Sequence, residues 1–310
     1  MFGFTFHYFE NEVHVPCQGS LTADQFRRIL DALAQQYRLN TPQEFMAHLQ
    51  NGTGKENDIC LCFDCGLKSQ YDIALPILEE RGLRAFWFLY TSVFQGQIVP
   101  IEQYHHFRFS CFSDVAEFYK LFFQMLRSRD AVRYCEGVEA FRREGYLSWA
   151  KFYTDEDRMF KFFRDRVLET REYDMLLEEM MNRVGYDVQQ HRHNLWLNPG
   201  EVQYLSSTGH EIGMHTHTHP NEIGALSYEA QLAEYATNQQ ILEEICHKPV
   251  ICMSHPCNSY NADTLRVLEK LGVQFGFRAD QNQTFTSHLE IPRIDHSQWL
   301  SLTNIIRTSF

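Results

Sequence analysis

The sequence predicts an α/β fold with a parallel sheet, interrupted in the middle of the chain by a helical segment. Short apolar runs such as Ile59–Phe63 alternate with amphipathic helical stretches in both end regions. Such runs are typical of parallel strands that are buried on both faces. Residues 96–194, in contrast, have helical periodicity and no evident strand. We therefore expect one domain formed by residues 1–95 and 195–310, with residues 96–194 inserted as a helical subdomain.

Capping patterns and periodicity locate the elements of the first region. Thr22 and Gln25 form a capping-box pattern in front of apolar residues at helical spacing. Pro42 suits the first position of a second helix, and Gly82 is expected to end a third one. The expected elements are, in order, a strand at 2–9, helices from 22 and from 42, a strand at 59–63, a helix at 70–81 and a strand at 85–90.

The middle of the chain is rich in Phe, Tyr, Arg and Glu, and its pattern predicts three or four helices. Ser113, Thr154 and Thr170 are the expected caps of these helices. Strand–helix alternation resumes with a helix that opens at Asn198 and ends at Gly209. The remaining expected elements are strands at 211–215, 250–254 and 273–277, with helices at 227–246 and 262–271.

The composition indicates which cellular compartment and which classes of partner to expect. The chain has 310 residues, a formal net charge of −12 and 44% hydrophobic residues. This charge argues against nucleic acid or an anionic membrane as the main partner. No apolar run approaches the length of a membrane span, and the first residues do not resemble a secretory leader. The nine cysteines are odd in number and often lie in apolar runs, which is typical of reduced thiols. We expect a cytoplasmic protein without an integral membrane segment.

Polar side chains that could carry chemistry follow three of the predicted strands. They are Asp64-Cys65-Gly66, the segment from His215 to Pro220, and the segment from Ser254 to Asn261. The C-terminal ends of parallel strands are where active sites of β/α barrels are built. The alternative for the first segment is a strand-to-helix turn with an incidental aspartate. The alternative for the third is that His255 is a structural residue.

Three histidines occupy alternate positions in the second segment. His215, His217 and His219 share one face if the segment is extended, and His215 and His219 also share one face of a helical turn. In either conformation these two can converge on one metal ion, because imidazole suits Zn, Fe, Ni and Cu. The alternative is a polar turn that binds no metal.

The order of these segments resembles the NodB, or carbohydrate esterase 4, family of polysaccharide deacetylases. Phe63-Asp64-Cys65-Gly66 is similar to the family's first motif, Phe-Asp-Asp-Gly, and His215 to Pro220 is similar to its second, His-x-x-x-His-Pro. Ser254 to Tyr260 resembles the third motif in a diverged form, and Ile291 to Asp295 resembles a late strand of many members. The resemblance covers roughly residues 1–95 and 195–300.

This resemblance implies a distorted (β/α) barrel and the metal-dependent hydrolysis of an acetamide on a carbohydrate. It implies that Asp64 is the general base and that His215 and His219 bind a divalent metal. Such a metal polarises the acetamide carbonyl and lowers the pKa of bound water. Pro256 and Tyr260, in the third motif, are the implied substrate-binding residues.

Cys65 departs from the family pattern, because this position normally holds an aspartate that is the third metal ligand. A thiolate is an excellent ligand for zinc, so we expect Cys65, His215 and His219 to bind zinc and to leave one position open. The alternatives are that Asp64 itself moves onto the metal, or that the site is weak or lost.

His255 is a second departure, since the third motif normally carries an arginine that braces the base. Arg293, or Asp295 beside it, is a candidate to restore the lost charge pairing, and His255 is a candidate for the general acid. The alternative for Arg293 and Asp295 is a surface ion pair, which contributes little. The family also has a histidine late in the chain that acts as the general acid. His288 and His296 both lie in sequence that does not match the family's motifs, so neither is assigned to this role.

The expected function is removal of an N-acetyl or similar short acyl group from a carbohydrate, with a nucleotide sugar or a lipid-linked precursor of surface polysaccharide as the substrate. The alternatives are a degenerate barrel that binds sugar or a partner without hydrolysis, and a metal amidase for a non-sugar amide. Residues 96–194 are expected to form a lid, a homodimer interface or a wall that selects substrates. The alternative is that they only pack outside the barrel.

Overall fold

Parallel strands form a sheet that closes on itself in the computed structural model, which describes residues 1–17, 19–148, 153–279 and 287–303. The strand order is β1-β8-β7-β6-β5-β4-β3-β2, and a further pairing of β1 with β3 closes the ring and leaves β2 outside it. This confirms the predicted parallel (β/α) barrel. The strands are β1 (Phe2–Phe6), β2 (Arg38–Leu39), β3 (Asp58–Asp64), β4 (Ala85–Leu89), β5 (Glu211–Met214), β6 (Cys252–Ser254), β7 (Phe275–Arg278) and β8 (Ile291–Asp295).

Side-chain alternation along the strands separates an outer core from the barrel interior. Phe2, Phe4 and Phe6 of β1 pack outward, in the same core as the apolar residues of the first helix. In β3 the alternate residues Cys60 and Cys62 point inward and pack against rings of β4 and β7. Because successive side chains of a strand point to opposite faces, the next inward position of β3 is Asp64, at the C-terminal end of the strand.

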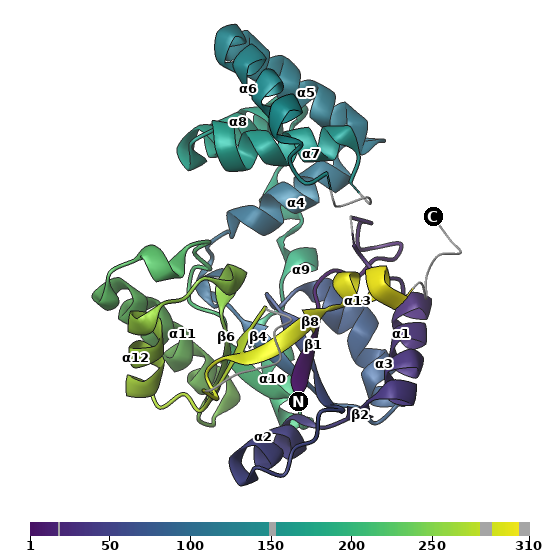
Figure 1. Ribbon diagram of the computed structural model, residues 1–310, viewed down its shortest axis with the longest axis vertical. Helices are drawn as coiled ribbons and strands as arrows, with labels where there is room; N and C mark the ends of the chain where they lie inside the picture. Colours follow the sequence, from purple (N-terminus) through teal and green to yellow (C-terminus); the bar gives the residue numbers. More distant parts are fainter. Residues whose placement is uncertain (18, 149–152, 280–286, 304–310) are drawn as a thin grey trace. The chain divides into compact units, whose positions relative to one another are not determined.

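The helices that follow the strands surround the barrel (Figure 1). Thr22 and Gln25 form the predicted capping box at the first helix, and Asn198 caps another helix in the same way. The segment predicted as a helix at 70–81 begins with a π-helical turn, Gln70–Ala74, before its regular part. These helices are α1 (Ala23–Gln36), α2 (Pro42–Asn51), α3 (Leu75–Glu80), α9 (Arg192–Leu195), α10 (Pro199–Ser207), α11 (Tyr228–Cys246), α12 (Ala262–Lys270) and α13 (His296–Thr303).

Residues Pro100–His191 form a second unit, separate from the unit of Met1–Val99 and Arg192–Phe310. Its own core consists largely of Phe, Tyr, Leu and Met side chains. Its helices are α4 (Pro100–Ser110), α5 (Val115–Arg129), α6 (Ala131–Glu144), α7 (Asp155–Phe162) and α8 (Thr170–Val184). The proposed roles of this helical unit as a lid, a substrate-selecting wall or a homodimer interface stay predictions.

Two of the helix caps predicted in the helical unit are wrong by one residue. Asp114, not Ser113, caps α5, because its carboxylate accepts from the amide of Ala116 at 2.8 Å. Glu169, not Thr170, occupies the cap of α8 and forms a reciprocal box with Glu172. Thr154 caps α7 as predicted. Across the described parts of both units, no helix is both long enough and apolar enough to pass through a membrane.

Candidate active site

The strand register brings three chain segments together at the C-terminal end of the barrel. Phe6 is paired with Phe63, so the residues that follow them, His7 and Asp64, leave adjacent strand ends. On the other side of β1, Thr5 is paired with Asp295. The ends of β1, β3 and β8 therefore deliver His7, Asp64 and Asp295 to one place.

Asp64 forms a buried, two-pronged ion pair with Arg293 of β8. The two guanidinium nitrogens donate to the two carboxylate oxygens at 2.6 and 2.8 Å. Both side chains are nearly inaccessible, at 4% and 3% exposure, so this is not a surface ion pair. Gly3 makes room for the pair, because a Cβ at this position would stand 2.8 Å from Cγ of Arg293. Arg293 thus supplies the charge pairing for which the third motif has no arginine.

The pairing determines the protonation state of Asp64. Burial alone would raise the pKa of its carboxyl group. The positive charge of Arg293, a contribution from His215 and the hydrogen bonds of Arg293 outweigh burial and hold this pKa well below its ordinary value. Asp64 is therefore an ionised carboxylate at neutral pH, as a proton acceptor must be.

His7 stands beside this carboxylate, and it was not singled out by the sequence. Its Nε2 lies 3.8 Å from Oδ2 of Asp64, and its Nδ1 donates to Oδ2 of Asp295 at 3.2 Å. Burial lowers the pKa of His7, but the hydrogen bond and charge of Asp295 and the charge of Asp64 outweigh it, so the pKa is raised. The signal in the sequence that could have identified His7 is its place near the C-terminal end of the first predicted strand, residues 2–9.

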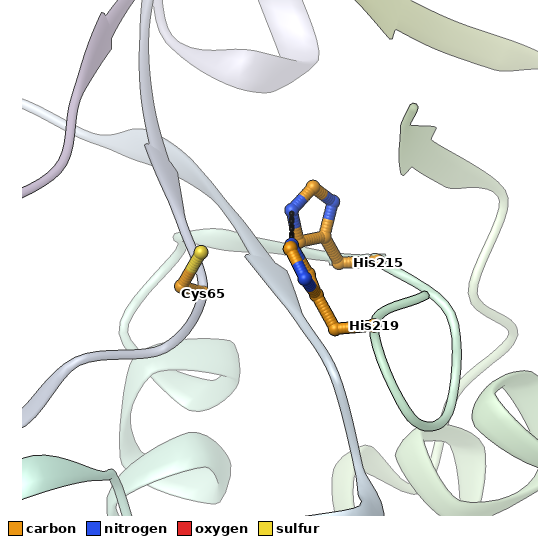
Figure 2. Close-up of side chains that lie close together, drawn as sticks. All are labelled: Cys65, His215 and His219. Carbon is orange, nitrogen blue, oxygen red and sulfur yellow. Dashed lines mark hydrogen bonds between the residues drawn. The ribbon is translucent and has the colours of Figure 1, made fainter. Parts of the chain in front are cut away.

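His215 and His219 meet with Cys65 on the same side of the barrel. Nε2 of His215 lies 3.2 Å from Nε2 of His219, and the ligand atoms of these two residues and Sγ of Cys65 all lie within 4.8 Å of one another. Figure 2 shows the two imidazoles joined by this contact and Cys65 on a separate segment beside them. Among the described residues, this is the group of three or more His, Cys, Asp or Glu side chains that can hold a metal.

The surrounding backbone fixes the orientation of these donors. Nδ1 of His215 donates to the carbonyl of Ser254 at 2.9 Å, which leaves its Nε2 unprotonated in the neutral ring. Cys65, Thr216 and His219 have φ values of 76°, 64° and 57°, in the left-handed region that non-glycine residues seldom adopt. Such strain is held in place at functional sites by the structure around it.

Glu234 holds the loop that carries the two histidines. Its carboxylate accepts from the amides of His217 at 2.9 Å and Thr218 at 2.8 Å. Burial lowers the pKa of His215 to about 3 and also lowers that of His219. Both rings are therefore neutral at pH 7, which is the form of imidazole that binds metals.

The donor set fits a zinc ion. Two nitrogens bound to one tetrahedral zinc stand about 3.3 Å apart, given Zn–N distances of about 2.0–2.1 Å. The separation of 3.2 Å between the two Nε2 atoms matches this value. Without a cation, this contact requires a proton on Nε2 of His219, and it leaves Nδ1 of that ring buried with no partner among the described residues. A cation bound to both Nε2 atoms would remove the need for a proton between them.

In the third motif the hydroxyl of Ser254 donates to Oδ2 of Asp64 at 3.4 Å, whereas His255, Pro256 and Tyr260 make other contacts. His255 is bonded through Nε2 to the carbonyl of Leu289 at 2.8 Å and stacks on Tyr260, with ring centroids 4.2 Å apart. Burial lowers the pKa of His255 to about 4. The hydroxyl of Tyr260 donates to Glu290 at 2.9 Å, and Pro256 is buried at the start of a short turn. Catalytic and substrate-binding roles for this group stay predictions.

The two late histidines also lie in other surroundings. His296 is buried, with Nε2 2.9 Å from the carbonyl of Gly19 and its ring stacked on Phe6. The ring of His288 stacks on Phe275, with a centroid distance of 6.0 Å. The structure therefore brings His7, and neither of these residues, beside Asp64.

Comparison with known proteins agrees with the fold and the motifs. The model of the Polysaccharide deacetylase family matches residues 170–276, which include His215, His219 and His255. YxkH of Bacillus subtilis (strain 168), classed with the polysaccharide deacetylases, is 30% identical over 87 residues. This alignment spans 28% of the present chain and 30% of YxkH, so the chain covers about a third of that relative's length.

Two solved structures share the fold over nearly the whole chain. The Streptococcus pyogenes deacetylase PplD, solved with acetate, superposes with a TM-score of 0.57 at 13% identity and covers 96% of both chains. IcaB from Ammonifex degensii gives a TM-score of 0.56 at 12% identity and covers 98% of this chain and 94% of its own. The chain is therefore similar to polysaccharide deacetylases in its fold and, over residues 170–276, in its sequence, and it carries a separate helical unit at Pro100–His191.

Proposed function

We propose that the protein is a zinc-dependent hydrolase that removes an N-acetyl or similar short acyl group from a carbohydrate. The observation that carries this proposal is the convergence of two groups at one end of the barrel. One group is the soft donor set of Cys65, His215 and His219. The other is an ionised carboxylate, Asp64, with a protonatable imidazole, His7, 3.8 Å away. Amide hydrolysis needs both an electrophile that polarises the carbonyl and a pair of groups that move protons.

Cys65, His215 and His219 would hold the cation, which when bound would polarise the acyl carbonyl as a Lewis acid. Asp64 takes the proton from the attacking water as a bond forms between the water oxygen and the carbonyl carbon. Arg293 keeps Asp64 ionised and oriented during this step. The tetrahedral adduct then breaks its carbon–nitrogen bond.

His7 protonates the nitrogen as that bond breaks, so that a neutral amine leaves and the other product is acetic acid, which ionises to acetate in water. The proton that Asp64 took from the water restores His7. Nε2 is the ring nitrogen that faces Asp64, while Nδ1 is bonded to Asp295. Asp295 acts through His7: it fixes the ring and favours its protonated form. This makes Asp295 a positioning residue, whereas Asp64 and His7 are the catalytic pair.

Asp295→Asn should move the alkaline limit of activity to lower pH. A general acid works in its protonated form, so activity falls as the pH rises through the pKa of His7. Asparagine keeps an oxygen that accepts from Nδ1 but removes the negative charge that raises this pKa. We expect the alkaline limb of the kcat/KM profile to shift down by roughly one pH unit or more.

A matched control for this shift is Asp72→Asn, which alters a second histidine–carboxylate pair. Nε2 of His14 lies 2.9 Å from Oδ2 of Asp72. The alkaline limb of this variant should coincide with that of the wild type. An unshifted limb in Asp295→Asn, with the acid limb also unchanged, would remove His7 from the role of general acid.

The nine cysteines are odd in number, and several are buried among apolar strand residues, a pattern that is typical of reduced thiols. On this basis we propose that the protein acts in the cytoplasm. A cytoplasmic carbohydrate deacetylase would meet nucleotide sugars or lipid-linked precursors of surface polysaccharide, and these are the proposed substrates.

An acetate-release assay tests the proposed function. Purified protein, loaded with zinc, is incubated with N-acetylated nucleotide sugars, with lipid-linked N-acetylated sugars and with N-acetylated amines that carry no sugar. We expect acetate from at least one sugar substrate, loss of activity on removal of the metal by a chelator, and recovery on addition of zinc. Acetate release from non-sugar amides alone would indicate an amidase. Folded, zinc-loaded protein that binds sugars and hydrolyses none of these substrates would indicate a degenerate barrel.

A further inference from the structure

The connections between the barrel and the helical unit touch both loops that carry the candidate metal ligands. The chain leaves the barrel after β4 through Tyr90, Thr91 and the 3-10 turn Ser92–Gln95, and it returns through α9 to Leu197. These two connections, residues 90–97 and 192–197, are here called the stem. All of the stem belongs to the unit that contains the barrel.

The returning half of the stem is attached to the turn that presents Cys65. Trp196 pairs with Leu67 as an isolated antiparallel bridge, and the amide of Leu197 donates to the carbonyl of Gly66 at 3.0 Å. These backbone contacts lie one and two residues beyond Cys65. They therefore hold the turn in which Cys65 has its left-handed backbone conformation.

The side chain of Trp196 also reaches the other half of the donor set through Tyr90. Nε1 of Trp196 donates to the hydroxyl of Tyr90. The ring of Tyr90 lies edge-on to the imidazole of His219, with centroids 5.4 Å apart and an interplanar angle of 66°. Trp196 and Tyr90 are 4% and 1% exposed, so this hydrogen bond is shielded from water and costly to break.

The outgoing half of the stem holds the loop of His215 to His219. The amides of Thr91 and Ser92 donate to the carbonyl of His217 at 3.2 and 2.9 Å, and Oγ1 of Thr91 lies 2.9 Å from Nδ1 of His217. Arg192 then joins the two halves, because its guanidinium donates to the carbonyls of Gly96 and Val93. The stem therefore connects the turn of Cys65 with the loop of His215 to His219, which are far apart in sequence.

We propose that Trp196 is a positioning residue that sets the distance between Cys65 and His219. Its backbone holds the Cys65 turn, and its indole, through Tyr90, holds the ring of His219. The two groups must reach their positions together for a cation to bind, and outer contacts of this kind commonly change metal affinity by about 10–100-fold. The inference rests on the proposed metal site. It assigns to the stem the role of holding Cys65 and His219 in place for one cation.

The test is zinc affinity, measured by competition with a chromophoric chelator on the full-length protein. Trp196→Phe keeps an aromatic ring and the backbone bridge but removes the indole donor. Tyr90→Phe keeps the ring against His219 and removes only the hydroxyl, so it tests the same hydrogen bond with little change in volume. We expect each variant to raise the dissociation constant for zinc by about 10-fold or more. The dissociation constant of the double variant should be little higher than that of the weaker-binding single variant, because both changes break the same hydrogen bond.

Trp87→Phe is the matched control. Trp87 is a buried tryptophan of β4 whose Nε1 donates to Nδ1 of His210 at 3.1 Å, away from the donor set. This variant should lose a comparable amount of thermal stability and bind zinc like the wild type. Wild-type affinity in both Trp196→Phe and Tyr90→Phe would overturn the positioning role while leaving the metal site intact. A wild-type protein that binds no zinc would instead overturn the metal site and, with it, the inference.

Discussion

Asp64→Asn should lower kcat for acetate release by about 10²–10⁴-fold, the usual contribution of a positioned proton acceptor. Asparagine has nearly the same shape as aspartate, but its amide cannot take a proton from water at neutral pH. The zinc content should stay at the wild-type level, since Asp64 is bonded to Arg293 and lies outside the donor set of Cys65, His215 and His219. Loss of zinc in this variant would reassign Asp64 from base to metal ligand.

The same substitution should also destabilise the fold. Removal of one partner of a buried ion pair leaves the other charge without compensation, at a cost of about 3–5 kcal/mol. Arg293 is 3% exposed, so water cannot replace the lost carboxylate. The role of Asp64 as a base implies a loss of activity, and its buried ion pair implies a second effect, on the free energy of unfolding.

A double variant separates the two effects. Asp64→Asn combined with Arg293→Met removes the uncompensated charge and keeps an apolar side chain of similar length. We expect urea unfolding to show recovered stability in the double variant, with activity as low as in the single one. Equal instability of the single and double variants would show that the cost does not come from the buried guanidinium.

Cys65→Ser should remove most of the bound zinc, as measured by metal analysis of protein purified without added metal. The serine hydroxyl is nearly isosteric with the thiol, but it is a poor zinc ligand at neutral pH. His215 and His219 are both neutral, so the thiolate is the anionic member of the donor set. Binding of the metal keeps that thiol deprotonated.

Cys62→Ser is the control, because Cys62 lies three residues before Cys65, within β3, and points into the barrel interior. It should retain zinc, although a hydroxyl in this apolar interior will lower stability. Cys65→Asp restores the residue type of the family pattern, and we expect it to recover binding with a preference shifted towards harder metals. Equal zinc content in the wild type and Cys65→Ser would refute the assignment of Cys65 as a ligand.

Local patterns in the sequence determined much of the barrel and one half of the site. Buried strands, capping boxes and glycine stops depend on neighbouring residues, so the strands before Asp64 and before His215 were predictable. The proximity of His215 and His219 was predictable for the same reason, because only three residues of one loop separate them. The resemblance to the deacetylase motifs then predicted Cys65, from another strand end, as the third donor.

Only the tertiary structure decided which groups face the Asp64 carboxylate. His7 directly follows β1, Asp64 ends β3 and Arg293 lies in β8. These strands become neighbours only when the pairing of β1 with both β3 and β8 closes the barrel. Inspection of the sequence left Arg293 and Asp295 as alternatives and overlooked His7. Strand register resolved both points, since it places Arg293 beside Gly3, which leaves room for its side chain, and Asp295 against His7. Contacts across a closed sheet depend on which strands are paired and in which register, and no local pattern of residues carries that information.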